Sequence, residues 1–174
     1  KEQQTPYSVF YQDGRAASKR LRTLMDWDLF DFPKDELVLQ EIVEMLTAEN
    51  DIIVDFFAGS STTAHSVMLQ NATDGGNRKF IMVQLNESIN EKSSAYDAGF
   101  ETIAEISRER IRRAAKEILN GKCHDDWEKD IGFRSFKIDS SNMTDVYYNP
   151  DAIIQDDLFA QVDNIKADRT EEDL

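Results

Sequence analysis

The feature that most constrains this sequence is a succession of strand, small-residue turn, helix and second strand. Residues 51–57 (DIIVDFF) form a short and almost continuous apolar run, which is typical of a strand buried on both faces of a parallel sheet. Small and hydroxylic residues follow at 58–63, and helical spacing resumes over 64–69. A turn at 74–77 leads to a second apolar run at 79–85 (KFIMVQL). This order predicts a βαβ unit, in which ligands bind at the carboxyl ends of the strands.

Helical patterns flank this unit on both sides. Apolar residues recur at helical spacing over residues 36–46 and again over residues 100–120, which is the longest predicted helix. Residues 16–25 have a helical pattern with a basic cluster, and residues 132–139 (GFRSFKID) alternate loosely, as an edge strand does. We therefore expect an α/β fold with a parallel βαβ core, flanking helices and an incomplete sheet.

The composition restricts the class of protein and its partners. The chain has 174 residues, about one domain, and its 34 acidic and 20 basic residues give a formal net charge of −14. Because this charge repels a polyphosphate, we do not expect the chain to form most of a DNA-binding surface. No apolar run reaches the roughly 18–20 residues that span a bilayer. The single Cys123 cannot form an internal disulfide and fits a reducing cytoplasm, and no Cys/His spacing predicts a metal site.

Two acidic residues stand at the predicted ends of the two strands. Asp55 ends the first strand, where a carboxylate can bind a cationic group, and Glu87 ends the second, where a carboxylate can accept hydrogen bonds from two ribose hydroxyls. Between them, Gly59 permits a backbone path and a close approach that a Cβ atom would block. Two acids at neighbouring strand ends would otherwise repel each other, so a cationic ligand with hydroxyl groups accounts for both.

The same residues distinguish between classes of nucleotide. A pyrophosphate dinucleotide favours Gly-x-Gly-x-x-Gly with no acid at the strand end, and the phosphate-loop pattern Gly-x-x-x-x-Gly-Lys-Ser/Thr is absent. Asp55 favours the aminoacyl end of S-adenosylmethionine instead. Spacing alone leaves two other interpretations open: an ordinary βα turn in which Glu87 is a solvated loop acid, and an oxidoreductase that binds a dinucleotide.

Several segments resemble one known family in consecutive order. Residues 55–65 (DFFAGSSTTAH) resemble motif I of the β-class DNA amino-methyltransferases, usually Asp-Pro/Phe-Phe-x-Gly-Ser-Gly-Thr-Thr. Upstream, residues 30–34 (FDFPK) resemble motif X, which folds over the methionine end of the cofactor. Other segments are similar to the type III modification subunits in particular, namely residues 74–81, 83–87, 102–115 and 132–142.

The resemblance implies a partial Rossmann-like fold of the S-adenosylmethionine-dependent methyltransferases. Asp55 would bind the methionine ammonium group and Glu87 the ribose. The other implied cofactor residues are Phe56, Phe57, Ala58, Gly59 and Ser60 as a backbone cradle, Thr62 and Thr63 capping the helix near the carboxylate, and Phe32, Pro33 and Lys34 closing that side. The sequence departs from the family pattern twice, since Ser61 replaces the second motif I glycine and Asp35 replaces a proline.

The resemblance also implies a function. In this class the catalytic Asp-Pro-Pro-Tyr motif and the target-recognition domain precede motif X, and no Asn/Asp-Pro-Pro-aromatic occurs here, since Pro6, Pro33 and Pro150 stand alone. That motif orients the flipped adenine for methyl transfer. We expect the S-adenosylmethionine-binding part of a site-specific DNA adenine-N6 methyltransferase of a type III restriction-modification system, without a catalytic residue and inactive alone.

Three segments and several partners are expected. The segments are an N-terminal one with motif X (1–35), a cofactor-binding α/β half-domain (36–142) and an acidic C-terminal extension (143–174). The partners are DNA, mainly through other regions, a second modification subunit and the restriction subunit, in the cytoplasm and without a membrane. An alternative stays open, in which the chain is an assembly module for these subunits and has no activity of its own.

Two further groups of side chains have expected places. The basic residues Arg108, Arg110, Arg112, Arg113 and Lys116 are expected on the polar side of the helix over 100–120, partly neutralised by neighbouring glutamates. They form a conceivable DNA patch. His65, one turn into the helix after motif I, is expected to be packed or capping rather than a catalytic base.

Overall fold

The computed structural model describes residues 9, 13–138, 140, 142 and 166. The chain divides into two compact units, residues 1–133 and residues 134–174, and the described helices and strands all belong to the first. Apart from Lys166, the acidic extension predicted over residues 143–174 lies outside the described residues.

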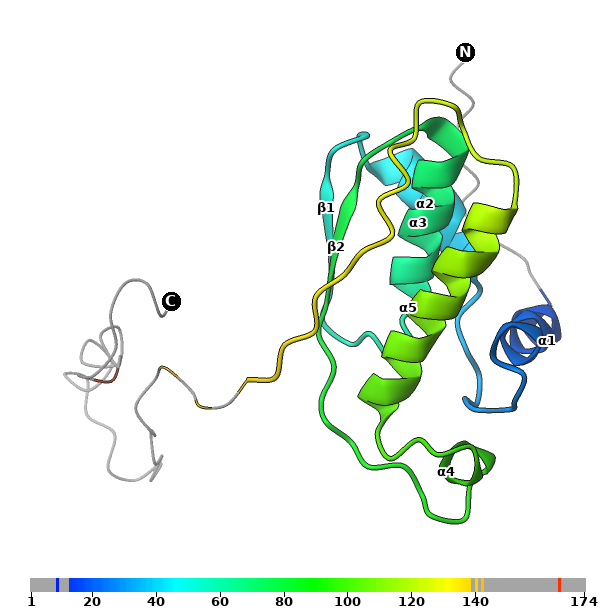
Figure 1. The fold of residues 1–174 in the computed structure, drawn as a ribbon, viewed down its shortest axis with the longest axis vertical. Coiled ribbons are helices and arrows are strands. Elements are labelled where there is room, and N and C mark those ends of the chain that lie inside the picture. Colours follow the sequence, from blue (N-terminus) through cyan, green and yellow to red (C-terminus); the bar gives the residue numbers. More distant parts are fainter. Residues whose placement is uncertain (1–8, 10–12, 139, 141, 143–165, 167–174) are drawn as a thin grey trace. The chain divides into compact units, whose positions relative to one another are not determined.

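The first unit combines helices with a two-stranded parallel sheet (Figure 1). In chain order its elements are α1 (Gly14–Met25), α2 (Glu36–Leu46), β1 (Ile52–Asp55), α3 (Thr62–Asp74), β2 (Lys79–Met82), α4 (Ser94–Asp97) and α5 (Ile103–Asn120). The strands pair from Ile52 with Lys79 to Asp55 with Met82, and α3 connects them, which confirms the predicted βαβ unit. None of the described helices has both the length and the apolar character needed to cross a bilayer.

The ends of the helices follow from local side chains. Asp35 accepts hydrogen bonds from the N–H groups of Leu37 and Val38 and so starts α2 at the predicted residue. Thr102 starts α5 with a capping box that it forms with Glu105. Gly75 ends α3 in the left-handed conformation, which confirms the turn predicted at 74–77 but leaves α3 five residues longer than the predicted 64–69 segment at that end.

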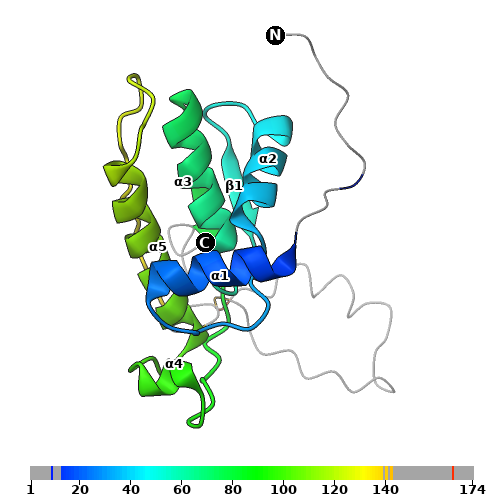
Figure 2. The ribbon, with the colours of Figure 1, turned by 90° about the vertical axis from the view of Figure 1, so that its right-hand side faces the viewer.

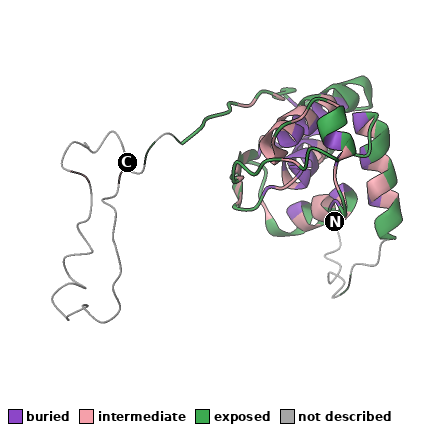
Figure 3. Ribbon diagram, turned by 90° about the horizontal axis from the view of Figure 1, so that it is seen from below, coloured by how far each residue is buried: buried purple, intermediate pink, exposed green. Residues whose placement is uncertain are grey.

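The helices form one layer beside the sheet, with α3 at its centre. In Figures 1 and 2, α2 and α5 flank α3 on one side of the strands, and α1 runs across α5. Small residues on α3, such as Ala64, Ser66 and Ala72, allow its neighbours to approach closely. The ribbon in Figure 3 marks the buried residues, which gather within the group of helices. The main core comprises Ala64, Met68, Ala72, Ile111, Ala114, Ala115, Ile118 and Trp127, with Phe80 and Met82 of β2 packed against it.

The other face of the sheet is exposed, which corrects the prediction that both strands are buried on both faces. Ile52, Val54 and Ile81 are 63, 45 and 51 % exposed. Because side chains alternate along a strand and Phe80 and Met82 face the helices, these apolar residues lie on the opposite side. The helices that the structure describes therefore cover one face of a sheet type that is normally covered on both.

The edge strand predicted over residues 132–139 is also wrong for the part that the structure describes. Residues 132–138 form no strand, and Phe136 and Ile138 are 85 and 84 % exposed. Loose alternation of apolar residues is not sufficient for a strand, since a strand also needs a neighbouring backbone to pair with.

Candidate functional site

The carboxyl ends of β1 and β2 open onto the turn that leads into α3. The parallel pairing continues past both strands, because the Val83 N–H donates to the Asp55 carbonyl at 2.8 Å and the Ala58 N–H donates to the Val83 carbonyl at 3.0 Å. Glu87 is exposed and lies five residues after Met82, the pairing partner of Asp55. Asp55 is thus the last residue of β1, and Glu87 follows the carboxyl end of the adjacent parallel strand β2.

The Asp55 carboxylate organises this turn. Its Oδ1 accepts a hydrogen bond from the Phe57 N–H at 3.0 Å, and its Oδ2 accepts one from Thr63 Oγ1 at 2.6 Å. The side chain is half-buried. Since a carboxylate has about four lone-pair positions, it retains capacity for a donor from a ligand.

The turn has a left-handed backbone at two positions. Gly59 has a φ of +52°, and a Cβ atom there would lie 3.4 Å from the Phe30 ring, so a glycine suits this position. The Gly59 N–H donates to Gln84 Oε1 at 2.7 Å. The N–H groups of Phe57, Ala58 and Gly59, all part of the predicted cradle, thus donate to acceptors within the protein. Hydrogen bonds to Asp55, Val83 and Gln84 therefore fix the backbone of this turn.

The predicted capping of α3 by Thr62 and Thr63 is wrong. The N-cap is Ser61, with a φ of +57° and no side-chain hydrogen bond to the helix. Thr62 Oγ1 accepts from Arg110 instead, and Thr63 Oγ1 donates to Asp55. The first turn of α3 therefore lacks a side-chain cap, and its N–H groups and helix dipole favour an anion at this end.

Replacing Ser61 with glycine is expected to stabilise the chain by about 1 kcal/mol, because a left-handed conformation costs an L-residue roughly that much and glycine very little. Urea unfolding of the two chains measures the difference. Ser61 Oγ is also buried and has no hydrogen-bond partner among the described residues, so Ser61→Ala is the matched control that removes the hydroxyl but keeps the strain. Equal stability of the glycine and alanine variants would contradict the strain.

The segment that resembles motif X lies beside this turn. Pro33 is buried, whereas Lys34 is exposed and Phe32 is 93 % exposed with a φ of +51°. Such a conformation is unusual for an aromatic residue and is found most often at binding sites. Asp35, which replaces the family proline, caps α2 and forms an ion pair with Arg20 at 2.6 Å, so its carboxylate gives the chain a defined turn there.

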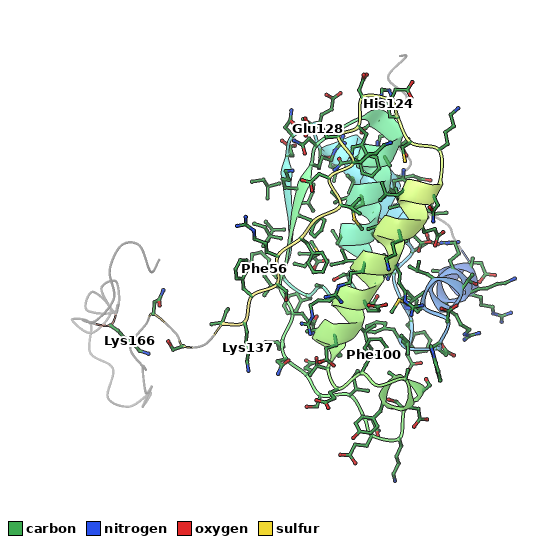
Figure 4. The ribbon with its side chains drawn as sticks, viewed as in Figure 1. Phe56, Phe100, His124, Glu128, Lys137 and Lys166 are labelled. Atoms are coloured by element: carbon green, nitrogen blue, oxygen red, sulfur yellow. The ribbon has the colours of Figure 1, made fainter. Side chains whose placement is uncertain are left out.

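Exposed aromatic and apolar residues lie close in sequence to the two acids. Phe56 and Phe57 are 67 and 87 % exposed, Leu85 is 67 % exposed, and Phe56 points away from the helices in Figure 4. Together with Phe32 they provide apolar surface for the carbon skeleton of a ligand. Among the described residues, no three His, Cys, Asp or Glu side chains gather closely enough to hold a metal ion.

The predicted position of Arg110 is wrong. Arg110 was expected on the polar side of α5, but it is 1 % exposed and bonded to Ser60 and Thr62. Arg110 lies three residues after Ser107 and four before Ala114, so it falls on the buried side of the helix. This helical spacing could have indicated its burial from the sequence. The remaining arginines of this stretch pair with acids, such as Arg113 with Glu109, so they form no free basic patch among the described residues.

His65 is buried on α3, behind the turn, as a packed histidine. Burial, with smaller contributions from the positive charges of Arg110 and Arg20, lowers the pKa of His65 from 6.5 to about 3. The imidazole is therefore neutral at physiological pH.

Comparison with known proteins relates this arrangement to DNA methylation. A family described as DNA methylase matches residues 1–120. The Mod subunit of the type III restriction-modification enzyme StyLTI from Salmonella typhimurium is 37 % identical over 123 residues, 71 % of this chain and 19 % of that subunit. The EcoP15I Mod subunit from Escherichia coli is 32 % identical over 133 residues, 75 % of this chain and 19 % of that subunit.

The likeness also includes a type II enzyme. The methyltransferase M.KpnI from Klebsiella pneumoniae is 35 % identical over 104 residues, 60 % of this chain and 24 % of that protein. The chain spans about a fifth of the type III Mod subunits that it matches. The family match includes both acids, the turn and all the described helices and strands. This chain therefore belongs to the N6/N4 DNA methylase family and is similar to type III Mod subunits.

Proposed function

We propose that this chain provides the S-adenosylmethionine-binding part of a DNA adenine-N6 methyltransferase of a type III restriction-modification system. The observation that carries the proposal is the arrangement of residues at the carboxyl end of the sheet. There a half-buried Asp55, a left-handed turn at Gly59 and an uncapped start of α3 adjoin one another in a DNA methylase family member.

These residues fit the chemical groups of S-adenosylmethionine. The Asp55 carboxylate accepts hydrogen bonds from the methionine ammonium group, and the N-terminus of α3 suits the methionine carboxylate. The Glu87 carboxylate accepts hydrogen bonds from the ribose hydroxyls. Phe32, Pro33 and Lys34 close the methionine side, and the backbone of residues 56–60 shapes the floor. When bound, the cofactor supplies the sulfonium methyl group.

The exposed face of the sheet supports a partial Rossmann-like fold. In such folds both faces of a parallel sheet are covered, and Ile52, Val54 and Ile81 are the residue types that a second layer buries. We expect this face to contact further elements of the enzyme. The same face would suit the second candidate function, an assembly module for other modification or restriction subunits.

Methyl transfer requires residues outside this chain. The chain contains no Asn/Asp-Pro-Pro-aromatic motif to hold the flipped adenine, and its net charge of −14 disfavours extensive contact with the DNA backbone. The proposed partners of the complete enzyme are DNA, a second modification subunit and a restriction subunit.

Isothermal titration calorimetry tests the ligand class. The chain is expected to bind S-adenosylmethionine at one site and to give no saturable heat with NAD⁺, because a dinucleotide places its pyrophosphate near the Asp55 carboxylate. Saturable binding of NAD⁺ without binding of S-adenosylmethionine would contradict the proposal and favour an oxidoreductase. In a parallel assay, no radiolabelled methyl transfer to duplex DNA is expected from the chain alone, and transfer would contradict its inactivity.

A further inference from the structure

A second set of polar contacts supports the turn from behind, on α5. Arg110 Nη1 donates to Ser60 Oγ at 2.8 Å and to Thr62 Oγ1 at 2.7 Å. One turn earlier on the same side of α5, Ser107 Oγ donates to the Gly59 carbonyl oxygen. All the hydroxyls that Arg110 reaches are buried, so no solvent replaces these bonds if the arginine is removed.

The same guanidinium also reaches the start of α2. Arg110 Nη2 lies 3.7 Å from Glu36 Oε2, which makes an ion pair, and the other oxygen of Glu36 accepts from Arg20 Nε. Glu36 follows Asp35 directly, at the end of the segment that contains residues 32–34. Arg110 therefore links the turn to the start of α2, which follows the motif X segment in the chain.

A contribution to the free energy of folding does not by itself explain why the charged Arg110 is buried. Burial lowers the pKa of Arg110 to about 10, so the group is charged at neutral pH and loses hydration in the fold. Buried ion pairs can often be replaced by apolar side chains of similar volume without loss of stability. The expected contribution of Arg110 is therefore to geometry, because Nη1 holds both Ser60 and Thr62 while Nη2 of the same planar group pairs with Glu36.

We propose that Arg110 is a positioning residue that holds the turn over residues 59–62 in the conformation that binds S-adenosylmethionine, without touching the ligand itself. The inference rests on the proposed function for the identity of the ligand. Arg110 would act by keeping most molecules in the conformation that binds the ligand. If only a tenth of the molecules have that conformation, the apparent Kd rises about tenfold.

The test compares Arg110→Met and Arg110→Lys with a matched control, the buried Arg78 that precedes β2. Arg78 is also buried, bonds to Asp74 and Thr47, and lies at the opposite end of α3, roughly 20 Å from the turn. Each variant is titrated with S-adenosylmethionine, unfolded with urea, and followed by amide hydrogen exchange at residues 59–62. Ser107→Ala, which removes only the bond to Gly59, receives the same measurements in case Arg110→Met does not fold.

Arg110→Met is expected to raise the Kd about tenfold or more and to speed exchange at residues 59–62, and Arg110→Lys to restore part of the affinity. Arg78→Met is expected to leave the Kd within about twofold, even where it lowers stability more. Unchanged affinity and exchange in Arg110→Met and Ser107→Ala would overturn the inference, and so would an equal loss in Arg78→Met. If the unaltered chain binds no S-adenosylmethionine, the proposed function fails. Faster amide hydrogen exchange at residues 59–62 in Arg110→Met would then still support the positioning role, and unchanged exchange would contradict it.

Discussion

Lowering the pH from 7 to 4.5 is expected to reduce the free energy of unfolding by about 2 kcal/mol through His65 alone. The imidazole is neutral in the folded chain, with its pKa lowered to about 3, but it binds a proton near pH 6.5 once the chain unfolds. The unfolded state therefore holds more protons between these two values. The stability that neutral His65 contributes is complete above pH 6.5 and is lost as the pH falls toward 3.

Urea unfolding at several pH values measures this loss, and His65→Gln isolates its source. The glutamine variant is expected to lose about 2 kcal/mol less than the unaltered chain over the same range. His124→Gln is the matched control, because it makes the same substitution at the other histidine, which is exposed. The pKa values of Asp74 and Asp130 are lowered from 3.8, so their contributions fall off below this window. An unchanged pH dependence in His65→Gln would contradict the account of this histidine.

Asp55→Asn is expected to weaken S-adenosylmethionine binding about 10- to 100-fold, the usual range for losing one hydrogen bond to a charged group. Asparagine keeps an oxygen that can accept from Phe57 or Thr63, so the turn should persist while the negative charge is lost. Calorimetric titration gives the affinity, and urea unfolding shows that the fold is retained.

Asp51→Asn provides the control for this substitution. Asp51 immediately precedes β1, at the opposite end of the strand from Asp55, and its carboxylate accepts from the Ala48 N–H at 2.8 Å. The control removes the same charge from the same strand without changing the proposed site, so its affinity should equal that of the unaltered chain. Equal losses in the two variants would show a general effect of charge and would count against a specific role for Asp55.

The sequence predicted the parts of this fold that depend on local chemistry. The apolar spacing over 36–46 predicted the bounds of α2 that the structure confirms, and the glycine pair at 75–76 predicted the turn that follows α3. Asp55 and Glu87 were predicted as site residues because a parallel βαβ unit brings the ends of its strands together, and their role stays a prediction. The family, and the likeness to type III Mod subunits, followed from the motifs around them.

Other features depended on contacts that a pattern does not contain. An apolar run such as DIIVDFF is the same whether one or both faces of its strand are covered, so the exposure of Ile52 and Val54 could not be read from it. Arg110 was taken for a surface residue because it stands among other arginines, and only its phase with Ser107 and Ala114 distinguishes it. Thr62 and Thr63 have the composition of a cap, but Arg110 and Asp55 bond to their hydroxyls.

An NMR titration of the isotope-labelled chain with S-adenosylmethionine reports where the ligand binds. The largest changes in amide shifts are expected at residues 55–63 and around Glu87, with smaller changes at residues 32–34. Saturable changes confined to other parts of the chain, with Asp55 and Gly59 unaffected, would contradict the claim that this turn is the cofactor site.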